Sequence, residues 1–102
     1  LQLGNMYYYG DGVEEDKVKT VELWAKAAEQ DHEIAQYLLG KMYYDGDGVK
    51  KDKAKAAELW TKAAEQGHES AQLKLGKMYY DGDGVKKDKT KAVELWAKAA
   101  AE

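Results

Sequence analysis

The chain has 102 residues, which is enough for one modest domain and too few for two ordinary ones. It contains no Cys, and this excludes a disulfide framework, a thiolate nucleophile and a zinc site with Cys ligands. Its net charge of −3 argues against nucleic acid as the main partner, and no apolar run approaches the ~18 residues that a membrane-spanning helix needs. Abundant Ala, Leu, Glu and Lys, with no Pro, favour helix.

An internal repeat of 36 residues runs through the chain. A Trp, a Gly, a Tyr pair and an Asp each recur at this step: Trp24, Trp60 and Trp96; Gly4, Gly40 and Gly76; Tyr7-Tyr8, Tyr43-Tyr44 and Tyr79-Tyr80; Asp16, Asp52 and Asp88. A fixed period of this length is typical of a stacked repeat array. We expect a single array with units at about 1–32, 33–68 and 69–102, the first truncated at its N-terminus.

One unit reads as helix, loop and helix, and the third copy illustrates each part. A first helix is predicted over 69–80, with four residues at helical spacing on its apolar stripe: Ala71, Leu75, Met78 and Tyr79. The loop 81–85 contains two Gly, and Asp88 stands at the N-cap of a second helix near 89–100. Five residues form the apolar face of that helix: Ala92, Leu95, Trp96, Ala99 and Ala100. Neither helix can bury its stripe alone, so the copies must stack.

The second helices end differently in the first two copies. Gly67 suits the left-handed backbone that commonly terminates a helix. The first copy has Asp31 at the same place, and a residue with a Cβ fits that conformation less well.

Two motifs indicate the kind of repeat. Leu39-Gly40-Lys41-Met42-Tyr43 fits the L-G-x-x-Y core of tetratricopeptide repeats, and Ala56-x-x-x-Trp60 is similar to their A-x-x-x-F. The period of 36 exceeds their ~34, the loop is longer and the terminal Pro is missing. The G-x-G-V loop followed by D-x-x-K-A-x-x-x-W-x-x-K-A-A resembles the Sel1-like repeats along the whole chain. This resemblance implies an all-α fold, a right-handed α-solenoid of helix–loop–helix repeats (an α/α superhelix), and a role as a scaffold or adaptor for other proteins.

The Asp-Gly loops share some features with calcium-binding loops. An EF-hand loop counted from Asp45 would need an oxygen ligand at Val49, a Gly at Lys50 and a Glu at Ala56. The alternative, a turn in which Gly gives the geometry and Asp forms local hydrogen bonds, fits the residues better.

The two histidines stand one at each junction between units. His32 and His68 are expected about 10 Å apart, which is too far to share a metal, and each should hydrogen-bond nearby backbone. No Ser/His/Asp set, H-E-x-x-H motif or phosphate-binding Gly loop is present. We therefore expect no enzyme activity, no catalytic residue, no metal and no cofactor.

Tyrosines follow the first helices and suggest a binding groove. If these helices line a concave face, as the resemblance implies, the partner-binding positions fall on three groups of residues: Asn5, Tyr8 and Tyr9; Tyr37, Lys41, Tyr44 and Asp45; Leu73, Lys77, Tyr80 and Asp81. Tyr8, Tyr44 and Tyr80 should be partly exposed. The alternative is that each ring packs on a neighbouring repeat and leaves only its hydroxyl in water.

Net charge changes along the array from −5 in residues 1–36, through 0 in residues 37–72, to +2 in residues 73–102. Neither terminal unit has an obvious polar capping repeat, which suggests self-association through the ends, the acidic start meeting the basic finish.

Two functions therefore compete. The first is a non-catalytic protein–protein interaction scaffold that presents a concave helical face to a peptide or protein. The second is a structural module, either a fragment of a longer array or an engineered repeat, that binds no ligand and self-associates through uncapped ends.

Overall fold

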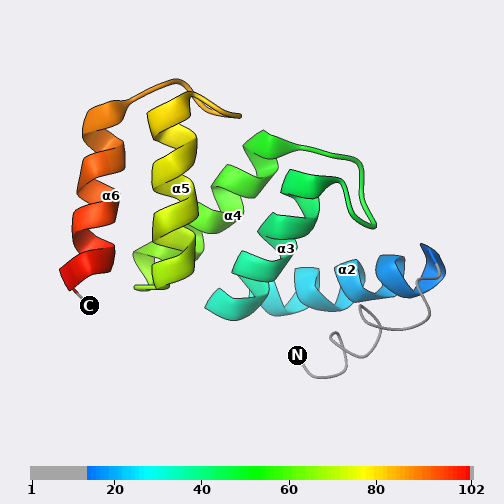
Figure 1. Ribbon diagram of the computed structural model, residues 1–102. Coiled ribbons are helices and arrows are strands. Elements are labelled where there is room, and N and C mark those ends of the chain that lie inside the picture. Colours follow the sequence, from blue (N-terminus) through cyan, green and yellow to red (C-terminus); the bar gives the residue numbers. More distant parts are fainter. Residues whose placement is uncertain (1–13, 102) are drawn as a thin grey trace.

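The computed structural model describes residues 14–101, with side chains from residue 17 onward. This part of the chain forms five helices and no strand: α2 (Glu14–Glu29), α3 (Glu33–Asp45), α4 (Lys53–Glu65), α5 (Glu69–Asp81) and α6 (Lys89–Ala101). Helix α2 is the second helix of the first unit, while α3–α4 and α5–α6 are complete units (Figure 1). The predicted all-α solenoid is confirmed. Within residues 14–101, no helix has the length and apolar character that crossing a membrane requires.

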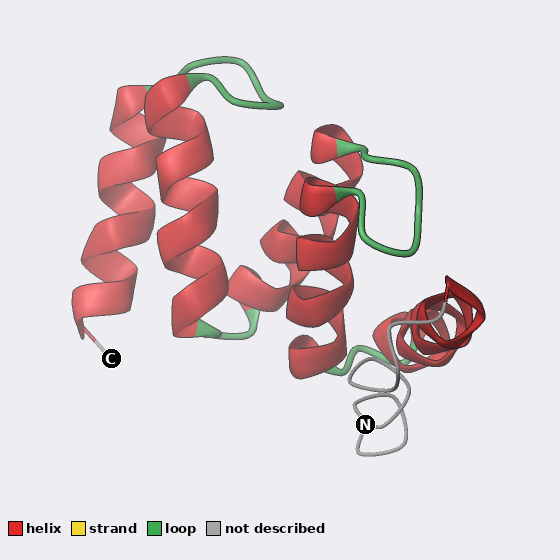
Figure 2. Cartoon of the chain, turned by 45° about the vertical axis from the view of Figure 1, so that its right-hand side comes forward, coloured by secondary structure: helices red, strands yellow, loops and turns green. Residues whose placement is uncertain are grey.

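Helices that follow one another in the chain pack side by side. The long loops 46–52 and 82–88 lie along one edge of the array, which we call the loop edge, and the short turns 30–32 and 66–68 lie along the opposite junction edge (Figure 2). Because every unit turns in the same way, residues 36 positions apart occupy equivalent places. The two described units therefore serve as internal controls for each other.

The core consists of two clusters, each formed between consecutive units. The first joins α2, α3 and α4 through Trp24, Ala28, Ala35, Leu39, Met42 and Leu59. The second joins α4 and α5 through Ala57, Trp60, Ala63, Ala64, Ala71, Leu75 and Met78. Small Ala residues let the helices approach closely, and one Trp per unit fills the remaining space.

Buried glutamines tie the units together near the junction edge. The Gln36 amide donates to the Ala28 carbonyl at 3.2 Å, and the Gln72 amide donates to the Ala64 carbonyl at 3.1 Å. Both glutamines are at most 2% exposed, so neither bond competes with water. Each bond links the first helix of one unit to the last turn of the unit before it.

The predicted helix boundaries agree closely with the structure. Asp52 and Asp88 cap α4 and α6, their carboxylates accepting from the backbone N–H groups of Lys55 and Lys91 at 3.0 Å each. This confirms the N-cap predicted at Asp88, and both carboxylates satisfy donors that have no partner inside the helix.

The apolar face predicted for the last helix is only partly buried. In α6, Ala92 and Ala99 are buried, whereas Leu95 and Trp96 are half-buried and Ala100 is exposed. The five residues form one apolar face, as predicted, but its outer half is left uncovered by the described helices. In α4 the equivalent residues are buried because α5 packs against them, and no described helix covers α6 in the same way.

Asp31 is the one non-glycine residue with positive φ in residues 14–101, at 65°, whereas Gly67 at the equivalent position has φ 85°. We expect Asp31→Gly to raise the free energy of unfolding by about 0.5–1 kcal/mol, because relief of left-handed strain outweighs the added entropy of the unfolded chain. Urea denaturation followed by circular dichroism measures the change. Gly67→Asp is the reciprocal control and should lower stability; equal stability of all three chains would contradict the strain.

Candidate functional site

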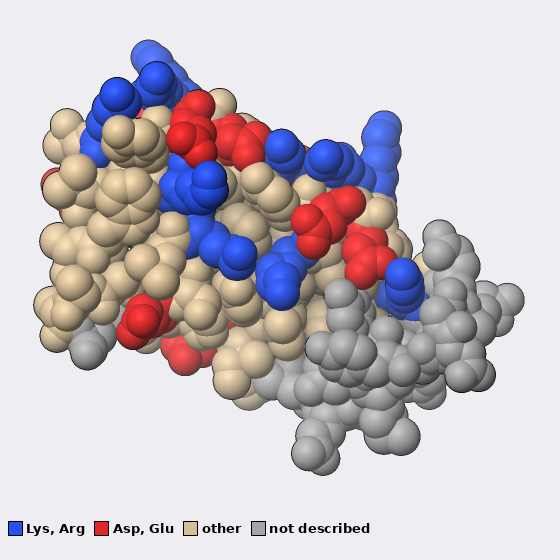
Figure 3. All heavy atoms as spheres, in the orientation of Figure 1, with Lys and Arg blue, Asp and Glu red and all other residues tan. Residues whose placement is uncertain are grey.

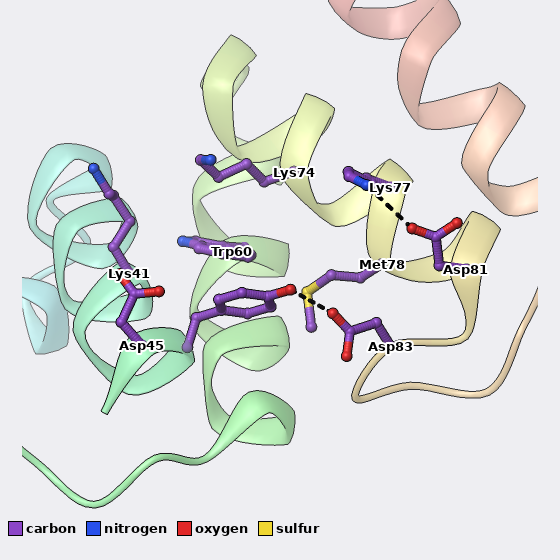
Figure 4. A pocket seen from close by; sticks show the side chains of 9 residues that line it. Lys41, Asp45, Trp60, Lys74, Lys77, Met78, Asp81 and Asp83 are labelled. Carbon is purple, nitrogen blue, oxygen red and sulfur yellow. Dashed lines mark hydrogen bonds and ion pairs between the residues drawn. The ribbon is translucent and has the colours of Figure 1, made fainter. Parts of the chain in front are cut away.

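A pocket of about 280 Å³ lies where the second and third units meet, between α3, α4 and α5. Nine residues line it: Lys41, Tyr44, Asp45, Trp60, Lys74, Lys77, Met78, Asp81 and Asp83. Figure 4 shows Trp60 and Met78 in the interior, with charged side chains from both units around them, and Tyr44 also lines the pocket. The pocket is therefore amphipathic and belongs to two repeats at once.

The aromatic wall is held by α3. The Tyr44 and Trp60 rings stack with centroids 5.5 Å apart, and the Trp60 indole N–H donates to the Tyr37 carbonyl at 2.9 Å. A Cβ on Gly40 would lie only 2.4 Å from Trp60 Nε1, so a side chain at that position would collide with the indole. The glycine of the L-G-x-x-Y motif is required because Trp60 lies directly on the backbone of α3.

Asp83 connects the third unit to the second. The Tyr44 hydroxyl donates to one carboxylate oxygen of Asp83, and Lys53 Nζ lies 2.8 Å from the other. Lys53 Nζ also lies 4.9 Å from the centre of the Tyr44 ring. A lysine of one unit therefore pairs with a loop aspartate of the next, and the pair Lys17–Asp47 repeats this contact one unit earlier, at 2.9 Å.

The same contacts shift the ionisation of the groups that make them. Hydrogen bonds from Lys53 and Tyr44 hold the pKa of the Asp83 carboxyl below its usual range. The hydrogen bond to Asp83, together with burial, raises the pKa of the Tyr44 hydroxyl. All of these shifts favour a charged Asp83 beside a neutral Tyr44.

Lysines dominate the free charge around the pocket. Within the described residues, Lys41, Lys74 and Asp45 form no ion pair, while Lys77 pairs with Asp81 at 3.3 Å on an exposed surface. Lys41 Nζ lies 5.9 Å from the centre of the Tyr37 ring. Figure 3 shows lysine and acidic side chains alternating across this face of the molecule.

Comparison with known proteins identifies the repeat. The Sel1 repeat model matches residues 1–32, 34–68 and 69–102. The chain belongs to the Sel1 repeat family. No curated protein sequence matches it significantly.

Three solved Sel1-type structures resemble this chain. The c5321 protective antigen of uropathogenic Escherichia coli, which displays an SLR fold, has a TM-score of 0.92 and 40% identity over 99% of this chain and 22% of its own. A Sel1 repeat protein from Oxalobacter formigenes has a TM-score of 0.88 and 38% identity over 98% of this chain and 41% of its own. Cysteine rich protein B of Helicobacter pylori has a TM-score of 0.79 and 35% identity over 81% of this chain and 62% of its own. The chain thus spans less than two thirds of each.

The structure brings together five of the residues predicted to line a Sel1 groove: Lys41, Tyr44, Asp45, Lys77 and Asp81. Tyr37 lies at the junction instead, where its ring packs 4.7 Å from the His68 ring. Leu73 and Tyr80 are 45% and 41% exposed and lie outside the pocket. The predicted positions Asn5, Tyr8 and Tyr9 fall outside the described residues.

The sequence interpretation missed four residues of the pocket: Trp60, Lys74, Met78 and Asp83. The apolar pattern predicts Trp60 and Met78 as core residues, and both are 2% exposed, so each is a core residue whose edge also forms the pocket wall. Turn chemistry predicts local hydrogen bonds for Asp83, whereas Asp83 binds side chains of the preceding unit. Asp47 and Asp83 recur at the 36-residue step, and this recurrence was the sequence signal that could have indicated a contact between units.

The tyrosines agree in part with the predicted binding groove and in part with the alternative of packed rings. Tyr44 is half-buried and Tyr80 is exposed, which confirms the partial exposure predicted for both. The Tyr44 ring, however, packs on Trp60 of its own unit, and its hydroxyl is bound to Asp83. The alternative was therefore wrong about the Tyr44 hydroxyl, which is not left in water, while the ring also packs against the core cluster that includes residues of the next unit.

The histidines behave differently from each other. His68 Nδ1 accepts from the Ala71 backbone N–H at 3.2 Å and caps α5, which confirms the predicted backbone bond. His32 stands at the same place before α3 but makes no side-chain cap bond, so that prediction was wrong there. In the part of the chain that the structure describes, no three His, Cys, Asp or Glu residues gather closely enough to hold a metal ion.

Asp83→Asn should lower the free energy of unfolding by about 0.5–1 kcal/mol at neutral pH, because the contact with Lys53 is partly exposed and screened. Since the folded pKa of Asp83 is depressed, its contribution is fully present above the ordinary carboxyl value of about 3.9 and is lost as pH falls through the folded value. The variant should therefore lose part of the acid dependence of stability, measured by urea denaturation across acid pH. Asp45→Asn, which removes an exposed and unpaired carboxylate, is the control; equal losses from the two variants would contradict the assignment.

Proposed function

We propose that the chain is a non-catalytic scaffold or adaptor that holds a peptide or protein partner against its helical face, with the pocket between α3, α4 and α5 as the anchor. Sel1 repeats are commonly protein-interaction modules, and this chain carries three of them. The pocket, with its aromatic wall and charged rim, is the observation that carries the proposal.

The size of the pocket favours a single side chain as its occupant. Sites for small molecules and cofactors usually measure about 300–1,000 Å³ and enclose most of the ligand. The pocket here has about 280 Å³ and opens between two units. An apolar or aromatic side chain of a peptide fits the wall of Tyr44, Trp60 and Met78, and anchors of this kind supply most of the binding energy at protein interfaces.

The charged residues at the rim of the pocket favour a partner whose anchoring side chain is flanked by acidic residues. Lys41 and Lys74 are exposed and unpaired within the described residues, against a single free carboxylate at Asp45. Charges on a rim chiefly set specificity and the rate of association. The partner segment is therefore an apolar or aromatic residue flanked by Asp or Glu.

A peptide array tests this proposal. Short peptides with a central Leu, Phe or Trp, flanked either by Glu or by Lys, are probed with the whole chain. The Glu-flanked set should bind more strongly, and Lys41→Glu with Lys74→Glu should abolish this preference while the melting temperature stays the same. Lys55→Glu with Lys62→Glu makes the same charge change at exposed positions outside the pocket and should leave binding intact. Equal binding of both sets, or no effect of the double variant at the rim, would overturn the proposal.

The second hypothesis, a structural module that self-associates, draws on a different part of the molecule. Its support is the exposed outer face of α6, which does not contribute to the pocket. Relatives of this chain are longer, and an array of Sel1 units can extend by adding further units to that face.

A further inference from the structure

One contact joins consecutive units at the loop edge, and it occurs twice in the described chain. Lys17 pairs with Asp47 at 2.9 Å and Lys53 pairs with Asp83 at 2.8 Å, each lysine thirty positions before its aspartate. The glycine that follows each aspartate lies against the same lysine: a Cβ on Gly84 would be 2.6 Å from Lys53 Cβ. An Asp-Gly loop therefore docks on a lysine, with Asp for the charge and Gly for close approach.

The third unit carries the side of this contact that binds the aspartate, formed by a tyrosine, a tryptophan and a lysine, and we call it the receiving half. The Tyr80 and Trp96 rings are 5.6 Å apart, and Lys89 Nζ lies 5.0 Å from the Tyr80 ring. In the second unit the corresponding separations are 5.5 Å and 4.9 Å. The same geometry is thus present at Tyr80 and Lys89, and within the described residues no carboxylate pairs with Lys89.

The surface around this receiving half is apolar and open. Val93 is 59% exposed and Ala100 is exposed, whereas their counterparts Ala57 and Ala64 are 6% and 8% exposed beneath α5. Val93, Trp96 and Ala100 lie three and four positions apart, so they form one stripe along α6. The outer face of α6 matches the face that α4 buries against the next unit.

We propose that the outer face of α6 is a docking site for the first unit of a second copy of this chain, with Asp11 of that copy bound to Lys89 and Tyr80. The segment Asp11-Gly12-Val13 repeats Asp47-Gly48-Val49 and Asp83-Gly84-Val85 in sequence. Asp11 lies outside the described residues and is assigned by this register. The charge of −5 in residues 1–36 complements the +2 in residues 73–102. Because different surfaces meet, the contact is heterologous and builds open chains of copies in place of closed dimers.

Charge reversal tests the pairing on the whole chain. By light scattering at low salt, the mean mass of the parent chain should rise with concentration, and high salt should reduce this rise. Lys89→Glu and Asp11→Lys should each weaken association at least about tenfold, because like charges then face each other. An equimolar mixture of the two variants should recover association, since each copy then offers the charge that the other needs. Tyr80→Phe, which removes only the hydroxyl, should weaken association about three- to tenfold.

Lys98→Glu is the matched control, because it makes the same charge change at the other end of α6 and should leave association intact. Circular dichroism confirms that each variant keeps its helices. A parent chain that stays monomeric at every concentration overturns the proposal, as does association that survives Lys89→Glu. Loss in both variants without recovery in the mixture overturns the pairing with Asp11. Peptide binding at the pocket should be unaffected by Lys89→Glu. The test of self-association is therefore independent of the test of the proposed function.

Discussion

Trp60→Ala is expected to lower the free energy of unfolding by about 3–5 kcal/mol, the range for removing a large aromatic side chain from a core. Trp60 is 2% exposed, packs within the cluster that joins α4 and α5, and donates its N–H to the Tyr37 carbonyl. Its removal leaves a cavity between two units and takes away the additional hydrogen bond to the Tyr37 carbonyl. Because domains are stable by only about 5–15 kcal/mol, this one substitution removes a large fraction of the total. Urea denaturation followed by far-ultraviolet circular dichroism gives the difference.

Trp96→Ala provides the matched comparison. It stands at the equivalent position and donates to the Leu73 carbonyl at 3.2 Å, but its ring is half-buried on the outer side of the last unit. Its removal should cost about 1–2 kcal/mol, because less apolar area returns to water and no enclosed cavity remains. Equal losses from the two substitutions would show that the tryptophans act within single units, contrary to the packing between units described above.

Gly40→Ala should lower the free energy of unfolding by about 1–2 kcal/mol, although alanine at an exposed helix position would raise it by about 1 kcal/mol. The added Cβ would lie 2.4 Å from Trp60 Nε1 and 2.6 Å from Trp60 Cδ1. Trp60 is 2% exposed and packs between α3 and α5, so shifting its ring or separating the helices costs packing energy. The same denaturation experiment measures the loss, and tryptophan fluorescence reports any displacement of the ring.

Gly76→Ala repeats the change where the ring has more room. A Cβ there would lie 2.4 Å from Trp96 Nε1, but the outer side of Trp96 is open and its ring can shift. The loss in the free energy of unfolding should therefore be smaller than at Gly40, because the ring can shift and the helix preference of alanine offsets most of the remaining cost. A larger loss at Gly76 than at Gly40 would contradict the role assigned to enclosure.

Features that depend on a few neighbouring residues were predictable from the sequence. The N-cap at Asp88, the left-handed residue after α4 at Gly67 and the bounds of α5 follow from local chemistry that any helix obeys. The all-α solenoid followed from the 36-residue period, because repeated units with one apolar face each must stack.

Features that depend on the register between units were not predictable in the same way. The bond from Tyr44 to Asp83 spans 39 positions, and turn chemistry alone gave Asp83 a local role. The two histidines show the limit in another way, since His32 and His68 share a motif position but only His68 caps its helix. The residues of the pocket also depend on the register between units. The sequence identifies which face of each helix they lie on, but the pocket forms only at one relative position of neighbouring units.

The two edges of the array are held by bonds that respond differently to solvent. Gln36 and Gln72 link units through buried amides at the junction edge, whereas half-exposed ion pairs link them at the loop edge. Acid and salt weaken ion pairs and leave neutral amide bonds intact. We therefore expect the units to rotate apart about the junction edge. This rotation should widen the pocket beside Asp83 before any helix unfolds. Small-angle scattering should show a larger radius of gyration at unchanged helicity as pH falls; simultaneous loss of both would rule out such a hinge.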